Sequence, residues 1–156
     1  MTVKSLKPAH GFTIVEVMTT IVILCVVIIG TSGYRYYAAL DARKAEMQTA
    51  ASRIGVLLCE SWRGLKGTET YNPVTQFSQV LAISQNTGFS VAGYKDASFT
   101  LLGSYLVSIN GTNYCAVLSW KNVATGLRAL NVAVVWPIQD RCNVYEPFKL
   151  TTYTTL

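Results

Sequence analysis

A continuous apolar run near the N-terminus limits what this chain can fold into. Residues 12–33 contain no Lys, Arg or Asp, and Glu16 carries the one charged side chain among them. A helix over these 22 residues rises about 33 Å, at about 1.5 Å per residue, which is enough to cross a hydrocarbon core of about 30 Å. A lone strand could not satisfy its backbone hydrogen bonds in lipid. The run therefore predicts a membrane-spanning helix.

The carboxylate of Glu16 is unusual in such a segment. A charged side chain at the centre of a bilayer costs about 2.5–3.5 kcal/mol on insertion scales, so an ionisable residue there marks a function by default. Glu16 stands only four residues after Phe12. From position alone, two interpretations remain open: the carboxylate pairs with a positive charge, or it lies close enough to the headgroups to stay hydrated.

The residues before the run do not have the order of a secretory signal peptide. Such a peptide places its apolar core before the cleavage site, whereas residues 1–11 (MTVKSLKPAHG) are short, basic and polar. The apolar run follows Gly11. Cleavage at Gly11 would therefore leave the predicted membrane helix in the mature protein.

The flanking charges give the expected orientation of the helix. Lys4 and Lys7 lie on its N-terminal side, and positive charge favours the cytoplasmic side of a membrane. Three basic residues beyond the run, Arg35, Arg43 and Lys44, weaken this asymmetry. We expect the N-terminus on the cytoplasmic side and the remainder of the chain on the other side.

The stretch from Gly11 to Val17 (GFTIVEV) resembles the prepilin signature of type IV pilins and type II secretion pseudopilins. The similarity extends over about residues 7–33: basic leader, glycine, phenylalanine, glutamate and long apolar tail. In that family a membrane peptidase cuts after the glycine and methylates the new N-terminal residue. The family's glutamate pairs with the N-terminal amine of a neighbouring subunit. The resemblance implies that Gly11 and Phe12 flank the cut, that Phe12 is N-methylated, and that Glu16 directs filament assembly.

Electrostatics is consistent with the role that the resemblance gives to Glu16. A free amine at a helix N-terminus adds a positive charge to the positive end of the helix dipole. A carboxylate offsets both. In a low-dielectric filament core, a subunit out of register would leave a buried charge unpaired, which is strongly unfavourable. The glutamate would therefore set the register of assembly.

One position departs from the family pattern. Major pilins tend to carry a proline 22 residues into the mature chain, and Gly33 stands there in this sequence. Glycine loosens a helix without removing a hydrogen-bond donor. The departure favours a minor pseudopilin or a minor pilin.

Residues 34–66 predict a second, amphipathic part of the same helix. The segment up to Trp62 has no proline and is rich in good helix formers. Apolar residues recur near the i, i+3, i+4, i+7 spacing of one helix face, namely Leu40, Met47, Ala50, Ala51, Ile54, Leu57 and Leu58. We expect this face to cover a sheet formed by the rest of the chain.

The remaining residues, 67–156, predict a small globular β domain. Residues 64–88 are rich in Gly, Thr, Asn, Ser and Gln, which is typical of a connecting loop, with a short helical turn at residues 77–83. Strands are expected at residues 98–109, 113–120 and 127–136, which are rich in β-branched and aromatic side chains. Asn110-Gly111 is a strong hairpin signal, and residues 121–126 close a second hairpin.

These elements predict an α+β fold, a long N-terminal helix packed on a small antiparallel sheet, which resembles the pilin fold. The expected organisation is a cleaved leader (1–11), a transmembrane helix (12–33), a periplasmic amphipathic helix (34–66) and the β domain (67–156). The sheet is an antiparallel meander of three or four strands, and Pro137 ends its third strand. The strand ending at Trp136 resembles the final strand of minor pilins and minor pseudopilins.

Four cysteines stand at positions 25, 59, 115 and 142. Cys25 is expected to act as a small apolar residue of the membrane helix, and Cys59 as part of the core. Pilins often carry a C-terminal disulfide, so the resemblance implies a bridge between Cys115 and Cys142. Bridges from Cys59 to either of these cysteines stay open.

Catalysis, cofactors and metal sites are not expected. The sole histidine is His10, so a chain cut at Gly11 has none left for acid–base or metal chemistry. The acids beyond the helix are scattered, at Glu69, Asp96, Asp140 and Glu146. The net charge is +5, but no dense basic stripe is present, so nucleic-acid binding is not favoured.

The resemblance favours a structural filament subunit. The partners that it implies are prepilin peptidase, other pilin or pseudopilin subunits, and inner-membrane lipid. The expected location is the bacterial inner membrane in a single pass, with the C-terminal domain periplasmic, or extracellular in an assembled filament. Two alternatives remain open: a pilin-like module for DNA uptake or adhesion, and a single-pass anchored protein whose leader is never cut.

Overall fold

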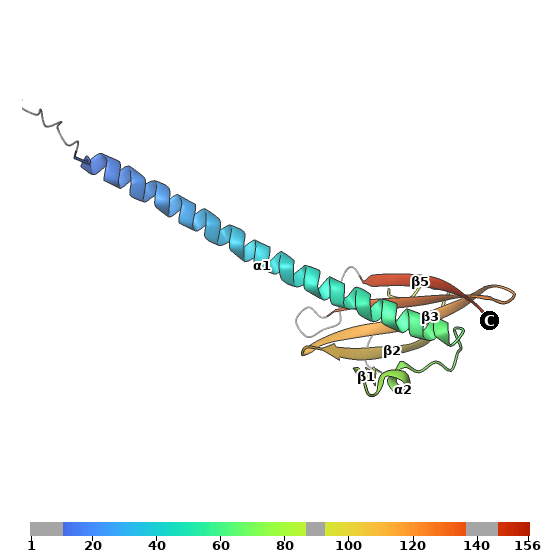
Figure 1. Cartoon of the computed structure of the whole chain (residues 1–156). Coiled ribbons are helices and arrows are strands. Elements are labelled where there is room, and N and C mark those ends of the chain that lie inside the picture. The colour runs from blue at the N-terminus through green and yellow to red at the C-terminus, as the bar shows by residue number, and fades with distance from the viewer. Residues whose placement is uncertain (1–10, 87–92, 137–146) are drawn as a thin grey trace, which may run out of the picture. The chain divides into compact units, whose positions relative to one another are not determined.

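The computed structural model describes residues 11–86, 93–136 and 147–156 of the chain (Figure 1). Two compact units are present, Met1–Arg43 and Lys44–Leu156. The helix α1 (Ile14–Gly64) contributes residues to both units. The part of α1 up to Arg43 belongs to the first unit. The part from Lys44 onward belongs to the second unit, where it packs on the sheet.

In the first unit, α1 presents apolar side chains all round its surface. Ile14, Val15, Met18, Leu24 and Val27, which point to different sides of the helix, are all more than 50% exposed, and no charged residue interrupts the run from Val17 to Tyr34. A helix that is apolar on every side belongs in an apolar surrounding. By length and composition α1 can cross a membrane, which agrees with the predicted spanning helix.

The end of α1 is set by two residues with left-handed backbone conformation. Lys66 has φ 55° and Gly67 has φ 63°, and the Gly67 amide donates to the Trp62 carbonyl at 3.0 Å. Such a bond satisfies a carbonyl that the last turn leaves without a helical partner. The helix therefore ends at Gly64, close to the predicted end of the amphipathic segment at residue 66.

The second unit contains a five-stranded antiparallel sheet over its described residues, in the order β1-β2-β3-β4-β5. Each strand pairs with the next in the sequence, so the sheet is a meander. The strands are β1 (Ala82–Gln85), β2 (Thr100–Ile109), β3 (Thr112–Ala124), β4 (Leu127–Val135) and β5 (Phe148–Thr155).

The core lies between one face of this sheet and one face of α1. The helix contributes Ala51, Ile54, Leu58, Cys59 and Trp62, which are at most 2% exposed. Alternate residues of the central strands meet them, including Tyr114, Ala116 and Leu118 of β3 and Leu130, Val132 and Val134 of β4. The predicted packing of helix on sheet is confirmed. Two helix positions were assigned wrongly, because Leu40 and Leu57 are 43% and 42% exposed.

One glycine allows the helix to approach the sheet closely. A Cβ atom on Gly55 would lie 2.7 Å from Cε1 and 2.9 Å from Cδ1 of Phe148 in β5. Gly55 is buried in the middle of a helix, where glycine is about 1 kcal/mol less favourable than alanine. The ring of Phe148 therefore occupies the space that a side chain at position 55 would need.

One of the two predicted hairpin turns has the predicted position, and the other is shorter than predicted. Asn110 and Gly111 have φ 50° and 77°, as a two-residue turn between β2 and β3 requires, so that prediction is confirmed. The second hairpin is tighter than the predicted loop of residues 121–126. β3 continues to Ala124, Lys121 pairs with Ala129, and the turn narrows to residues 125–126.

Three short or peripheral elements differ from the predictions. The helical turn expected at residues 77–83 lies earlier, as α2 (Pro73–Phe77), where the Asn72 side chain accepts from the Val74 amide at 3.0 Å. Residues 82–85 form β1 instead. β5 was not predicted, and it makes β4 an inner strand rather than the last one. Pro137 lies outside the described residues.

Candidate processing and assembly site

Three residues precede the first turn of α1. Gly11, Phe12 and Thr13 have no helical structure and are exposed, with Phe12 at 84%. The Thr13 hydroxyl oxygen accepts from the Glu16 amide at 3.3 Å. The Thr13 carbonyl accepts from the amides of Glu16 at 3.1 Å and Val17 at 3.2 Å. Thr13 is therefore the N-cap of the helix.

Glu16 occupies the third helical position, one turn from Phe12. Its side chain is exposed, and its carbonyl accepts from the hydroxyls of Thr19 at 3.0 Å and Thr20 at 2.6 Å. The ion pairs of the described residues are Arg63–Glu60 and Arg128–Glu69, so Glu16 forms none within that part of the chain. The structure brings Gly11, Phe12 and Glu16 together at one helix end.

The residues around this helix end are suited to lipid. The two threonine hydroxyls bond back to the helix carbonyl of Glu16, so they expose no free donor to an apolar surrounding. Every other side chain from Ile14 to Val17 is aliphatic. The Glu16 carboxylate is therefore the one charged side chain from Ile14 to Val17, and in lipid it needs a charged partner or water.

Sequence reasoning missed the role of Thr13. Thr13 and Glu16 have the S/T-x-x-E spacing of a capping box, in which the hydroxyl of the first residue bonds the amide of the fourth. The spacing is visible in the sequence, but the same residues were interpreted only as part of the signature. The geometry shows the first half of the box directly.

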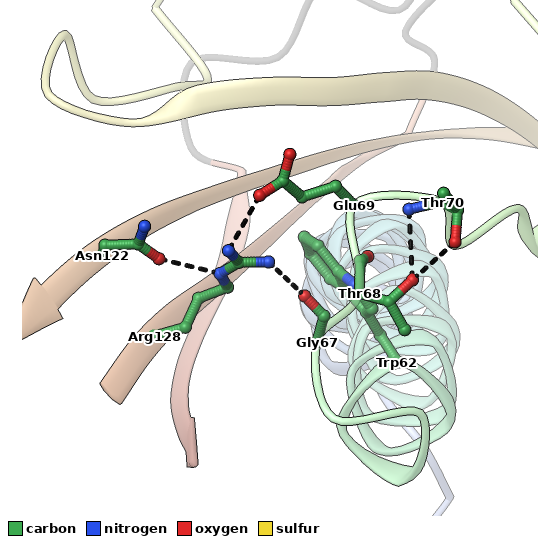
Figure 2. Close-up of polar contacts among 7 residues, drawn as sticks. All are labelled: Trp62, Gly67, Thr68, Glu69, Thr70, Asn122 and Arg128. Carbon is green, nitrogen blue, oxygen red and sulfur yellow. Dashed lines mark hydrogen bonds and ion pairs between the residues drawn. The ribbon is translucent and has the colours of Figure 1, made fainter. Parts of the chain in front are cut away.

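A second polar centre, also missed, lies in the globular unit (Figure 2). The guanidinium of Arg128 in β4 donates to Asn122 Oδ1 at 2.9 Å, to the Gly67 carbonyl at 2.8 Å and to Glu69 Oε1 at 2.9 Å. It also lies 4.1 Å from the centre of the Trp120 ring. The available signal was an arginine in β4, a strand whose other residues are apolar apart from Asn131.

The loop after α1 is held from the helix side as well. Trp62 Nε1 donates to the Thr68 carbonyl at 2.9 Å, and the hydroxyls of Thr68 and Thr70 lie 2.8 Å apart (Figure 2). The rings of Trp62 and Tyr71 stack with their centroids 5.7 Å apart. Burial raises the pKa of the Tyr71 hydroxyl, opposed by its hydrogen bond to Ser61. These contacts fix the loop that Arg128 binds, and this centre is structural.

The cysteines divide into free and bonded ones. Cys25 is exposed and Cys59 buried, and both are free thiols, which excludes the bridges from Cys59 that the sequence had left open. Burial is the main cause that raises the pKa of Cys59 to about 11, with a smaller contribution from the Glu60 charge. Cys115 is disulfide-bonded. Cys142 lies outside the described residues, so its pairing with Cys115 stays a prediction.

The acids of the β domain form no cluster in the described part of the chain. Glu69 binds Arg128, and the backbone hydrogen bond from Ser98 is the main cause that lowers the pKa of Asp96. Asp140 and Glu146 lie outside the described residues. No group of three or more His, Cys, Asp or Glu side chains able to hold a metal ion occurs in residues 11–86, 93–136 and 147–156.

Comparison with known protein families gives one match, and it covers the site just described. Residues 6–32 match the prokaryotic N-terminal methylation motif. No curated protein and no solved structure matches the chain. The match contains Gly11, Phe12, Thr13 and Glu16. Beyond it the long helix continues, and its last part packs on an antiparallel sheet. The chain therefore carries the N-terminal signature of type IV pilins and pseudopilins, on a fold of the pilin type.

Proposed function

We propose that this protein is a structural filament subunit, a minor pseudopilin of a type II secretion system or a minor type IV pilin. The observation that carries the proposal is the methylation motif placed at the start of an apolar helix. Prepilin peptidase would cut between Gly11 and Phe12 and methylate the Phe12 amine. The protein itself would have no catalytic role.

The assembly step depends on Glu16. Cleavage creates a positive amine on Phe12, beside the positive end of the α1 dipole. Within the described chain Glu16 has no ion-pair partner. In a bundle of such helices, the carboxylate of one subunit would bind the amine of the next, and a subunit without this contact would leave a charge unpaired in an apolar core.

Membrane topology follows from the same segment. The basic leader residues Lys4 and Lys7 would stay in the cytoplasm, α1 would cross the inner membrane once, and the β domain would lie in the periplasm or on the assembled filament. The partners in this proposal are prepilin peptidase, other pilin or pseudopilin subunits, and membrane lipid.

A minor rather than a major position in the filament is supported by the helix sequence. Gly33 stands where major pilins tend to have a proline, and α1 has no proline from Ile14 to Gly64. A helix without this break keeps its backbone hydrogen bonds through the membrane segment.

The assembly role can be tested with two matched variants in the organism's own filament system. Glu16→Gln keeps the shape of the side chain and removes its charge. Glu60→Gln makes the same change at an exposed ion pair with Arg63, where little is lost. The measurement is the amount of each variant in sheared filaments, relative to the amount in the membrane.

We expect Glu16→Gln to be present in the membrane but at least about tenfold depleted from filaments, because a buried amine would lose its partner. Glu60→Gln should assemble like the wild type. Equal incorporation of both variants would contradict the assembly role. Absence of the wild-type protein from every filament preparation would contradict the proposed function as a whole.

A further inference from the structure

A band of three tyrosines follows directly on the apolar run of α1. Tyr34, Tyr36 and Tyr37 are 76%, 64% and 68% exposed, and the rings of Tyr36 and Tyr37 meet edge to face with their centroids 5.8 Å apart. At about 100° per residue, positions 36 and 37 lie about 200° and 300° around the helix from position 34. The tyrosine band therefore surrounds the helix, which suits a partner that also surrounds it. A single protein surface would contact only part of the band.

The turn just before the tyrosine band is compatible with lipid. Residues 30–33 have the sequence GTSG, with no charged side chain. The Thr31 hydroxyl donates within the helix, to the carbonyls of Val27 at 2.9 Å and Ile28 at 3.1 Å, so it needs no water. The membrane-compatible part of α1 therefore continues through this turn to the tyrosines. Tyrosine is enriched at membrane–water interfaces, because its ring is apolar and its hydroxyl is polar.

The spacing along α1 places two interfacial groups about one bilayer apart. Glu16 and Tyr34 are separated by 18 positions of one helix, which is a rise of about 27 Å, close to the hydrocarbon thickness of about 30 Å. Cys25 stands midway between them, about 14 Å from each. When the tyrosine band lies among the headgroups on one side, Glu16 lies near the headgroups on the other side, and Cys25 lies near the centre.

We propose, on the basis of the spanning helix in the proposed function, that the tyrosine band binds the headgroup region of the phospholipid bilayer and sets the depth of α1. The rings pack beside the upper acyl chains and keep their hydroxyls among the headgroups. Arg35, inside the band, adds a cation for the lipid phosphates. At this depth water reaches the Glu16 carboxylate on the opposite side of the membrane.

This depth reconciles the two interpretations that position alone left open for Glu16. In a single subunit in the membrane, the carboxylate is hydrated near the headgroups. In a filament it exchanges water for the amine of a neighbouring subunit. The carboxylate therefore loses its water only when a charged partner is present, which avoids an unpaired charge in an apolar surrounding.

Without the tyrosine band, little would hold residues 30–33 in the bilayer. These four residues are less apolar than the aliphatic run before them. The helix would shift toward the side of the globular unit until part of this turn reached water, and Glu16 would be drawn toward the hydrocarbon. Interfacial tyrosines are among the anchors that determine how a helix sits in a bilayer.

The test measures the depth of Cys25 in the full-length precursor, in vesicles of phosphatidylethanolamine and phosphatidylglycerol. A nitroxide label on Cys25 reports depth through its collision rates with oxygen, which is concentrated at the bilayer centre, and with a water-soluble nickel complex. Cys25 is exposed and Cys59 is buried, so the folded protein in detergent is labelled at Cys25. Mass spectrometry of the peptides checks the position of the label.

Three variants are compared with the wild type. The first replaces Tyr34, Tyr36 and Tyr37 together by alanine, which keeps the helix and removes the rings. The second replaces the same three residues by tryptophan, which shares the preference for the membrane interface. The matched control is Tyr153→Ala, which removes a ring of the globular unit that is 57% exposed.

We expect the wild-type label within about 3 Å of the bilayer centre. The alanine variant should place it roughly 3–6 Å farther from the centre, which is the rise of two to four residues of the 30–33 turn. The tryptophan variant and Tyr153→Ala should have the wild-type depth. Recovery of the depth by tryptophan is the result that a role of the tyrosines in helix structure alone would not give.

Three results would overturn the inference. The wild-type label could lie far from the centre, the alanine variant could keep the wild-type depth, or the tryptophan variant could shift as much as the alanine variant. An unchanged depth in the alanine variant would assign the tyrosine band to another subunit rather than to lipid. A wild-type label that the nickel complex reaches as freely as in water would contradict the spanning helix of the proposed function itself, and that result is distinct from the other three.

Discussion

The Arg128 guanidinium donates to the Gly67 carbonyl at 2.8 Å, across 61 positions of sequence. The bond joins the loop that leaves α1 to the start of β4, and the same side chain binds Asn122 and Glu69. Its side chain is only 7% exposed, whereas that of Glu69 is 57% exposed. The Gly67 carbonyl therefore depends on the buried Arg128 guanidinium as its donor. The exposed Glu69 carboxylate can instead be hydrated by water when Arg128 is removed.

The first prediction concerns this cation. Arg128→Met removes the donors to the Gly67 carbonyl and to Asn122 while keeping an unbranched side chain in the core. We expect the free energy of unfolding to fall by about 2–4 kcal/mol, because buried acceptors lose a charged donor. The measurement is urea unfolding of the full-length protein in detergent, followed by the fluorescence of its three tryptophans, Trp62, Trp120 and Trp136. Arg63→Met, at the exposed pair with Glu60, should change stability by less than about 1 kcal/mol. Equal effects of the two variants would contradict the account.

The second prediction concerns the close approach of α1 to β5. Gly55→Ala places a methyl group 2.7 Å from the Phe148 ring. We expect a loss of about 1–3 kcal/mol from overpacking, although alanine has the higher helix propensity. The comparison is Gly64→Ala, where a Cβ atom meets nothing within 4 Å. In the same unfolding measurement Gly64→Ala should be neutral or slightly stabilising. A stabilised Gly55→Ala variant would show that Phe148 moves aside freely.

The third prediction concerns the buried thiol. The pKa of Cys59 is raised from 9.0 to about 11, so the folded state favours the neutral thiol. The resulting stability is fully present below about pH 9 and is lost as the pH rises through about 11. At pH 8 the folded protein should contain about a hundredfold less Cys59 thiolate than the unfolded chain. Alkylation at Cys59, measured by mass spectrometry in native buffer and in urea, should differ by at least that factor. Equal rates in the two states would contradict the burial of this side chain.

The helix and the central strands could be predicted because their signals are local. Apart from Glu16, residues 12–33 are all apolar, glycine or hydroxyl-bearing, and the β2–β3 turn is indicated by Asn110-Gly111. The edge strands lack such signals. β5 combines Phe148, Leu150 and Tyr153 with a lysine and four threonines and has no regular alternation, so only the pairing with β4 distinguishes this segment from a polar loop. β1 has four residues, too few for a period to show.

The N-terminal site could be predicted from the sequence for the same reason, because Gly11, Phe12 and Glu16 belong to one short motif. Thr13 could have been recognised from its spacing to Glu16. The full Arg128 network could not be predicted. Asn122 is the cross-strand neighbour of Arg128 in the β3–β4 hairpin, but Gly67 and Glu69 lie 61 and 59 positions away and meet Arg128 only when the end of α1 packs on the sheet. Nothing in the sequence near Arg128 indicates which carbonyl it binds.

The measurement that tests the account most directly is mass spectrometry of the N-terminal peptide of the protein isolated from its native membrane. The account predicts a peptide that begins at Phe12 and carries one added methyl group on its amine. A peptide that begins at Met1 would contradict prepilin processing. It would leave Glu16 as an unexplained carboxylate in an ordinary membrane anchor.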